Sequence, residues 1–389
     1  MPEQTYSVRF VGTEKAIPAG LWAACFPPPV EGHWWYRVLE ASGLEHQFQF
    51  LYGLIEHDGR PVGIAPMFTM RLEVEFLVPD ALIPFLALIG KLLPSLSAPT
   101  GLFIGSPCSD EGTVGLLPDV ERRDAFLALQ KAAEAEAARR GAGLVAWKDF
   151  PASEETDLAW LAQRAGLFRL ADFPGTVVAL PGPRKEDYLA QLSTSRRHNL
   201  KRKLKRSAQA FQPLIEAVQS PDAATLDEIY GLFEQTRARA KTTFEDLGRS
   251  FFENVARERV SHFIILREPE TRRAAAFMLC FLVGDHVINK YIGLDYSRPK
   301  DWFLYFRLFD AALDWALAQG ATAIQSGQTG YSGKLEQGHS LYPLTVYAKH
   351  RNAALHGVCR MIVPRIGWAT LDDDLATYLK AHPDADTGR

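Results

Sequence analysis

The same order of predicted elements occurs twice along this chain of 389 residues. Residues 50–70 and 263–282 each consist of two apolar segments joined by a charged turn, which is typical of a β-hairpin. After each hairpin come a short strand ending in Ile-Gly, a loop, an alanine-rich helix that ends at glycine, and one further strand. The repeat predicts two domains of one fold class, α/β with mixed sheets; chance similarity between two such domains is the alternative.

The boundary between the copies is predicted near Pro181-Gly182-Pro183, where a strand gives way to a turn and a charged helix. We therefore predict one domain over residues 1–180 and a second over 181–389. The first copy is longer because the apolar segment 71–99 is inserted between its hairpin and its Ile-Gly strand. The matched segments are LFIG (102–105) and KYIG (290–293), the helices 124–140 and 302–319, and the strands LVAW (144–147) and TAIQ (322–325).

One short segment of the second domain is dense in positive charge. Residues 195–206 read SRRHNLKRKLKR and hold seven Lys or Arg; since the formal net charge of the chain is −3, the other residues carry −10. Leu200 and Leu204 share one face at helical spacing, and Ser193 or Ser195 is a suitable N-cap. We predict two short helices here, the second with most of its cations facing solvent.

Three interpretations of these cations are open: a solvated helix face, a site for phosphate on a small donor or on tRNA, and recognition of a nucleic-acid duplex. Aromatic residues do not interleave with the cations, and no helix-turn-helix or zinc pattern surrounds them. We therefore expect no duplex DNA partner, while tRNA remains an alternative.

The rest of the composition indicates an ordinary cytoplasmic protein. The four cysteines form no CxxC pair, and the histidines form no HxxxH or HExxH pattern, so neither a disulfide framework nor a metal site is expected. The chain does not open on a basic and then apolar signal sequence. Residues 76–94 are the most apolar, but Asp80, Pro84 and Lys91 interrupt them, so we predict a buried helix or a peripheral membrane contact rather than a transmembrane span.

Residues 176–206, TVVALPGPRKEDYLAQLSTSRRHNLKRKLKR, resemble the start of the second domain in Fem-type peptidoglycan aminoacyltransferases and their N-acyltransferase relatives. The resemblance extends over roughly residues 45–350 and rests on the order of several segments rather than on one motif. Those segments are DEIYGLFEQTRARA (227–240), FEDLGRSFFENVARE (244–258), FDAALDWALAQGATAIQSGQ (309–328) and the glycine-rich turn GYSGKLEQG (330–338).

The resemblance implies tandem GNAT-like domains, the N-acetyltransferase fold, facing one another across a shared cleft. Two features of relatives are absent: the long helical hairpin of the tRNA-dependent enzymes, and the acetyl-CoA signature Gln/Arg-x-x-Gly-x-Gly/Ala, in whose place the loop after Ile292 reads GLDYSRPKDW. The resemblance therefore leaves acyl-CoA, acyl carrier protein and aminoacyl-tRNA open as co-substrates. No tightly bound cofactor is expected.

In this fold class an amine attacks the activated acyl carbonyl directly, so the site needs a proton acceptor, an oxyanion contact and a proton for the leaving group. Asp295 is the predicted proton acceptor and Tyr291 the predicted donor, although a half-buried strand followed by an Asp turn explains both residues equally. Tyr331 and Lys334 lie in SGQTGYSGK (326–334), whose glycines expose backbone N–H groups that can bind a phosphate or an oxyanion. A flexible surface loop is the alternative there.

Two further groups of residues are predicted to bind the substrates. The donor group combines cations of the basic helix with the loop after the last central strand: Arg196, Arg197, Lys201, Arg202, Ser326, Gly327 and Gln328. The acceptor group combines polar and aromatic residues of the first domain, for which a core helix and an ordinary turn are the alternatives: His33, Trp34, Asp110 and Glu111.

The predicted function is transfer of an acyl or aminoacyl group from an activated donor, such as an acyl thioester, to an amine without a covalent enzyme intermediate. One alternative is a Fem-type ligase that uses aminoacyl-tRNA. Another is a non-catalytic protein that binds a lipid or a cell-wall precursor.

Overall fold

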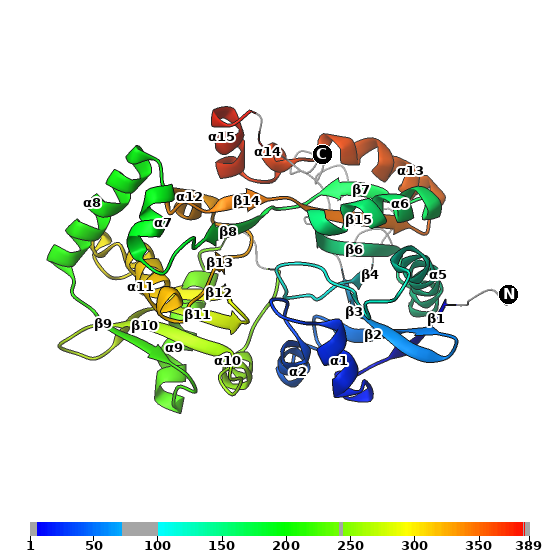
Figure 1. The fold of residues 1–389 in the computed structure, drawn as a ribbon, viewed down its shortest axis with the longest axis horizontal. Coiled ribbons are helices and arrows are strands. Elements are labelled where there is room, and N and C mark those ends of the chain that lie inside the picture. Colours follow the sequence, from blue (N-terminus) through cyan, green and yellow to red (C-terminus); the bar gives the residue numbers. More distant parts are fainter. Residues whose placement is uncertain (1–5, 72–99, 241–243, 384, 386–389) are drawn as a thin grey trace. The chain divides into compact units, whose positions relative to one another are not determined.

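The computed structural model describes residues 6–71, 100–240, 244–383 and 385. These residues form two compact units (Figure 1). Within the described residues, unit 1 comprises the chain up to Pro27, Leu44–Pro174 and Tyr342 onward, and unit 2 comprises Pro28–Gly43 and Gly175–Leu341. The units therefore do not follow the continuous ranges 1–180 and 181–389.

Unit 1 is built on a sheet with strand order β1-β2-β3-β4-β6-β15-β7, and β5 pairs with β3 at its side. Strands β4 and β6 are parallel, pairing Gly101–Ile104 with Leu144–Trp147. The elements are β1 (Tyr6–Val11), η1 (Glu14–Ala16), α1 (Ala19–Cys25), β2 (Gln49–His57), β3 (Arg60–Arg71), β4 (Thr100–Ile104), β5 (Gly115–Leu116), α5 (Arg122–Arg140), β6 (Leu144–Pro151), η4 (Ala152–Glu154), α6 (Glu155–Ala165), β7 (Phe168–Ala171), β15 (Leu344–His350), α13 (Ala353–Ile362), η6 (Val363–Arg365), α14 (Trp368–Leu371) and α15 (Asp373–Ala381).

Unit 2 is built on a sheet with strand order β14-β8-β13-β12-β11-β10-β9. Its elements are α2 (His33–Ala41), β8 (Gly175–Ala179), α7 (Lys185–Gln191), α8 (Thr194–Ala210), β9 (Leu214–Val218), α9 (Ala223–Arg237), α10 (Arg249–Val255), β10 (Ser261–Arg267), β11 (Ala274–Val283), β12 (His286–Leu294), η5 (Lys300–Trp302), α11 (Leu304–Ala318), β13 (Ala323–Gln325), α12 (Tyr331–Glu336) and β14 (Ser340–Tyr342).

The predicted repeat is present in the two sheets. The order β1-β2-β3-β4-β6 matches the order β9-β10-β11-β12-β13, with helices α5 and α11 in the same place in the chain order. The two predicted hairpins are β2–β3 and β10–β11. Both helices stop before a glycine in the left-handed conformation, Gly141 (φ 72°) after α5 and Gly320 (φ 74°) after α11.

At the position beyond β6 in one sheet and beyond β13 in the other, the two units exchange a strand. The strand antiparallel to β6 is β15, from the C-terminal part of the chain, whereas the strand antiparallel to β13 is β8, which follows unit 1 directly. Pairing in the sheet decides which unit a strand joins, and that pairing cannot be read from composition or turn residues. The predicted boundary at 180 therefore puts β8 with the wrong sheet.

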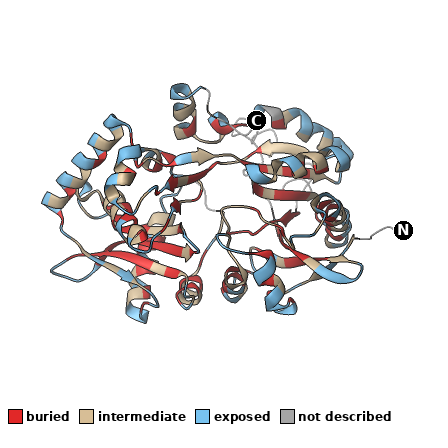
Figure 2. Ribbon diagram, viewed as in Figure 1, coloured by how far each residue is buried: buried red, intermediate tan, exposed pale blue. Residues whose placement is uncertain are grey.

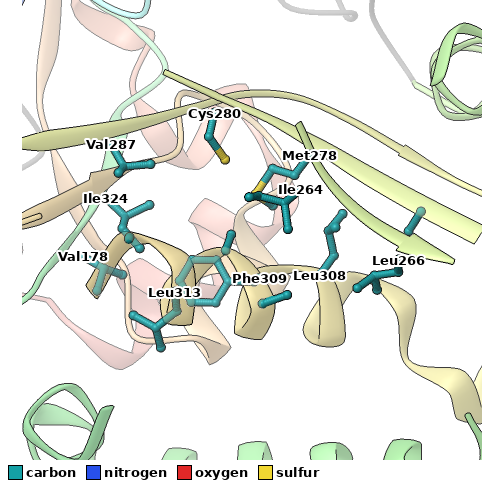
Figure 3. Close-up of a cluster of buried hydrophobic side chains, with 14 of the residues drawn as sticks. Val178, Ile264, Leu266, Met278, Cys280, Val287, Leu308, Phe309, Leu313 and Ile324 are labelled. Carbon is teal, nitrogen blue, oxygen red and sulfur yellow. The ribbon is translucent and has the colours of Figure 1, made fainter. Parts of the chain in front are cut away.

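Helix α11 packs on one face of the unit 2 sheet because its apolar residues recur at helical spacing (Figure 3). Leu308 and Phe309 lie against Ile264 and Met278 of the sheet (Figure 3). Helix α8 begins where predicted, since the Ser193 side chain accepts the Arg196 N–H. Its outer side is exposed (Figure 2).

The other face of the unit 2 sheet is aromatic. The Trp34 and Trp35 rings of α2 contact the Phe281 ring, with centroids 4.9 and 5.7 Å apart. Phe252 of α10 lies 6.1 Å from Phe277 in the same way. Helices α9 and α10 thus cover the face opposite α11.

The predicted buried helix or membrane contact at 76–94 lies outside the described residues, as do all but Arg71 of the predicted insertion. Among the helices that the structure describes, none is long and apolar enough to cross a bilayer.

Candidate active site

Strands β12 and β13 of unit 2 separate after a short parallel pairing. They pair only over His286–Ile288 and Ala323–Gln325, while β12 continues to Leu294. A bulge interrupts the other edge, since Cys280 pairs with Asn289 and Leu279 pairs with Tyr291. Among the residues that the structure describes, the part of β12 beyond Ile288 therefore has no strand partner on the β13 side. This open edge lies at the carboxyl end of parallel strands, where α/β proteins place their ligands.

The loop that follows β13 is held in one conformation by Lys334. The Nζ atom of Lys334 donates to the carbonyl oxygens of Gln328 (3.0 Å), Gly327 (3.2 Å) and Ser326. Thr176 of β8 adds a hydrogen bond from its hydroxyl to the Gly327 carbonyl at 2.8 Å. An ammonium has three N–H donors, so the charge of Lys334 is used inside the protein and its role is to position the loop.

The same loop has the irregular backbone expected of its glycines. Gly327, Thr329 and Gly330 all have φ near +60°. The N–H groups of Gly327 and Thr329 donate to no acceptor within the described residues. The glycine-rich segment differs from a plain turn, however, because residues Tyr331–Glu336 form the short helix α12.

A chain of hydrogen bonds links this loop to the open edge of β12. His339 Nδ1 lies 2.9 Å from the Lys334 carbonyl oxygen, which only accepts, so Nδ1 carries the proton and Nε2 accepts. The Ser326 hydroxyl donates to Nε2 at 2.9 Å and accepts from Asn289 Nδ2 at 3.2 Å. The Cys280 thiol donates to Asn289 Oδ1 at 3.1 Å, which fixes the orientation of the amide.

His339 is a neutral imidazole in this arrangement. Burial, and secondly the charge of Lys334, lower the pKa of His339 to about 3. Since the lowered pKa makes His339 a weak base, Ser326 is better suited to hydrogen bonding than to acting as a nucleophile activated by this imidazole.

The predicted catalytic residues Tyr291, in β12, and Asp295, just after β12, occupy different surroundings. The Tyr291 hydroxyl donates to Glu245 Oε1 at 3.0 Å on the face covered by α9 and α10. The Asp295 carboxylate accepts the N–H (3.0 Å) and hydroxyl (2.6 Å) of Ser297 and pairs with Arg298 at 2.9 Å. Although burial raises the pKa of Asp295, the bonds from Ser297 and Arg298 outweigh it and hold that pKa below its ordinary value. Asp295 is therefore a weak base.

Tyr331, the other predicted catalytic residue, is fully buried at the first position of α12. It lies in the same loop and helix as Ser326, Gly327, Gln328 and Lys334, so the structure brings these five predicted residues together. Asn289, Thr176 and His339 were not predicted. The sequence offers no local indication of them, since they are single polar residues that only the folded sheet assembles.

The predicted cations of the donor group lie along α8, which packs on α11. Lys203 is the exception among the helix cations, since it pairs with Glu336 and lies 3.9 Å from the centre of the Phe306 ring. Within the described chain, the remaining six form no ion pair: Arg196, Arg197, Lys201, Arg202, Lys205 and Arg206. This concentration of uncompensated charge is suited to an anionic ligand.

The predicted acceptor group does not lie within one unit. His33 and Trp34 belong to α2 of unit 2, and Trp34 serves the aromatic core described above. Asp110 and Glu111 lie in the loop after β4 of unit 1. In the part of the chain that the structure describes, no three His, Cys, Asp or Glu side chains are grouped as a metal site would need.

Unit 1 has its own polar cluster at the end of β6. Asp149 is buried with φ 61°, its carboxylate pairs with the Lys148 ammonium, and its carbonyl accepts the Gly112 N–H at 2.8 Å. Burial, and secondly the charge of Asp149, raise the pKa of Asp172 well above its ordinary value. These groups lie where the loop after β4 meets the end of β6.

We expect the Asp172→Asn variant to be more stable than the wild type at pH 8, by about 1 kcal/mol, and to lose that advantage near pH 5. A carboxyl whose pKa is raised by folding binds its proton more tightly in the folded state. Its contribution to stability is therefore complete below the unfolded pKa and declines as the pH rises towards the folded pKa. Urea unfolding at the two pH values measures this, with exposed Asp119→Asn as the matched control. Equal destabilisation of Asp172→Asn at both values would contradict the prediction.

Residues 181–362 match the family model FemAB_like, described as peptidoglycan biosynthesis or recognition. Among solved structures, the crystal structure of FemX is similar with a TM-score of 0.58 and 13% identity, covering 90% of this chain and 100% of FemX. The structure of L-PGS from Bacillus licheniformis gives a TM-score of 0.52 and 14% identity, covering 87% and 97%. None of the curated proteins compared with the chain matches it.

These matches confirm the predicted resemblance to the Fem-type family over residues 181–362 and the predicted fold class of two α/β domains with mixed sheets. At such low identity the likeness to solved structures shows the fold alone. The family match supports the prediction of an acyltransferase enzyme.

Proposed function

We infer, from the FemAB-like match of residues 181–362, that this Fem-type, peptidoglycan-related protein moves an acyl or aminoacyl group from an activated donor to an amine by direct attack. The observation that carries the proposal is the open edge of β12 beside a loop locked by Lys334. An extended amide-bearing ligand can pair with such an edge as an added strand.

In this proposal the two substrates arrive from opposite faces of the unit 2 sheet. Ser326 and His339 lie towards α11, since the His339 ring is 5.2 Å from the ring of Phe309. Tyr291 lies on the α9 and α10 face, with its ring 5.4 Å from that of Phe251. The donor would enter on the α11 face and the amine on the other, so that they meet where β12 and β13 separate.

Each group at this place has a defined chemical task. The Gly327 and Thr329 N–H groups would bind the oxyanion that forms on the acyl carbonyl. Glu245, rather than Asp295, would accept the ammonium proton, because it already orients the Tyr291 hydroxyl, whereas Ser297 and Arg298 hold the pKa of Asp295 below its ordinary value. Tyr291 would pass its hydroxyl proton to the leaving group at the edge where β12 and β13 separate, and it would regain a proton from Glu245, to which it is hydrogen-bonded.

The basic helix α8 would bind the phosphates of the donor, since it packs on α11 and six of its cations have no carboxylate partner among the described residues. That helix also supports the second candidate, an aminoacyl-tRNA donor, because the affinity for a polyanion rises with the number of cations that contact its phosphates. Acyl-CoA and acyl carrier protein carry fewer phosphates and would therefore contact fewer of these cations.

The test is the thermal midpoint of the wild type and of Arg197→Gln/Lys201→Gln with coenzyme A, an acyl-CoA, an acyl carrier protein and bulk tRNA. We expect the true donor class to raise the midpoint, since it binds only the folded state, and the double variant to reduce that rise. For tRNA, the variant should also lessen the salt dependence of binding by about two in log–log slope.

The control variant is Lys131→Gln/Arg164→Gln, which removes two exposed cations from helices of unit 1. A response to the thioester carriers alone would identify a small-donor acyltransferase, and a response to tRNA alone the Fem-type ligase. No response to any donor, or equal loss in both variants, would count against the proposal and favour a binding protein.

A further inference from the structure

Helix α13 of unit 1 presents an apolar ridge to solvent. None of its residues is buried, and Val358 and Met361 are 43% and 64% exposed. Ala354, Val358 and Met361 recur at i, i+4 and i+7, which places them on one side of the helix. An exposed apolar face rimmed by polar residues can mark a site where a membrane or another protein docks.

The opposite side of α13 attaches the helix to its own unit. The His356 ring lies 5.4 Å from the Phe168 ring of β7, and the His350 N–H of β15 donates to His356 Nδ1 at 3.3 Å. Leu355 and Ile362 are only partly exposed. These contacts fix the inner side of α13, and the helix is exposed or intermediate along its whole length (Figure 2).

The charge carried by α13 and the chain segments on either side of it is positive. Between Glu336 and Asp372 the sequence contains no Asp or Glu. Arg351, Arg360 and Arg365 lie on or beside α13, are exposed, and form no ion pair with any carboxylate of the described chain. Arg351 and Arg365 donate only to backbone carbonyls, those of Ala142 (3.2 Å) and Met361.

The nearest acidic residues in the sequence are the run Asp372–Asp374, which belongs to the start of α15. Asp372 caps α15 by accepting the N–H groups of Asp374 (2.8 Å) and Leu375 (3.2 Å). Helix α14 intervenes in the chain between this run and α13. The run therefore does not neutralise the arginines of α13.

We propose that α13 docks on the surface of an anionic lipid bilayer. The ridge enters the boundary between headgroups and acyl chains, and the three arginines bind lipid phosphates. Charge complementarity selects this occupant, because a second copy of the same face would bring arginine against arginine. The proposal concerns unit 1 and does not depend on the transfer reaction proposed for unit 2.

The experiment is flotation of the full-length protein with vesicles of phosphatidylcholine alone and of phosphatidylcholine mixed equally with phosphatidylglycerol. We expect binding to the mixed vesicles only. Val358→Ser/Met361→Ser should weaken it by at least about tenfold, and Arg360→Gln/Arg365→Gln by about fivefold for each charge. Ile215→Ser removes another exposed aliphatic side chain, 53% exposed on β9, and should leave binding unchanged.

The cations of α8 are a second source of attraction to anionic vesicles, so Lys201→Gln/Arg202→Gln is measured alongside. Loss of binding in this variant, with normal binding by Val358→Ser/Met361→Ser, would overturn the proposal. So would an absence of binding to both kinds of vesicle. A concentration-dependent dimer that Val358→Ser/Met361→Ser dissociates, without vesicle binding, would instead assign the ridge to self-association. Because all substitutions are exposed, unchanged thermal midpoints confirm that the variants fold.

Discussion

Replacing Lys334 with methionine should reduce the rate of transfer about 100-fold and lower the free energy of unfolding by about 3 kcal/mol. Methionine keeps most of the buried volume but removes the three donors. The carbonyl oxygens of Ser326, Gly327 and Gln328 then lose their shared partner in a largely buried place. The loop that would bind the oxyanion is no longer held at the open edge of β12.

Urea unfolding and the initial rate of transfer measure the two effects. Lys185→Met is the matched control, because its ammonium pairs with Asp310 and Asp314 at the surface, where an ion pair contributes less than about 1 kcal/mol. Lys334→Arg should not restore activity, since a planar guanidinium does not fit three convergent carbonyls. Wild-type rate and stability in Lys334→Met would show that the loop does not need this lysine.

A second large effect is expected for Gly293→Ala, which should lower the free energy of unfolding by about 2–4 kcal/mol. A Cβ atom at this position would lie 2.6 Å from the Leu232 carbonyl carbon and 2.7 Å from the Phe233 nitrogen, both in the backbone of α9. The side chain of Phe277 blocks the other direction at 2.4 Å. Helix α9 must therefore move away from β12, and the Tyr291–Glu245 contact would loosen with it.

Gly231→Ala, in the same helix, supplies a control of opposite sign. A Cβ there meets nothing within 4 Å, and alanine stabilises a helix interior over glycine by about 0.5–1 kcal/mol. Denaturant midpoints of the two variants make the comparison. Similar midpoints for Gly293→Ala and the wild type would mean that α9 is not in contact with β12 as described.

The repeat was predictable because each copy is defined by local signals: charged turns, alanine-rich helices and terminal glycines. The Ile-Gly pairs show the limit of that reasoning. Gly105 follows the last parallel pair of β4 with φ 125°, whereas Gly293 lies five residues beyond the last parallel pair of β12 and serves the close approach of α9. The two glycines therefore have different physical roles, and they do not occupy equivalent positions in the two sheets.

The candidate site was predictable only in part. The glycine-rich loop and Lys334 could be identified from their composition, although the direction of the ammonium, towards backbone rather than ligand, could not. His339 and Asn289 are far apart in the sequence and acquire a shared partner only when β12 and β13 pair. The lowered pKa of Asp295 likewise depends on the two hydrogen bonds from Ser297 and on Arg298 folding back onto the carboxylate, which the turn residues alone do not specify.

The exchange of β8 and β15 has a consequence for biosynthesis. While the ribosome is still translating unit 2, the sheet of unit 1 lacks the strand that joins β6 to β7, so β7 has no hydrogen-bonded neighbour in that sheet. In unit 2 the corresponding strand, β8, is made before the rest of the sheet, and only the edge strand β14 (Ser340–Tyr342) is made as late as β15. The N-terminal part of the nascent chain therefore keeps an unpaired β6 edge until the segment Leu344–His350 emerges, and an unpaired strand edge of this kind favours aggregation during synthesis.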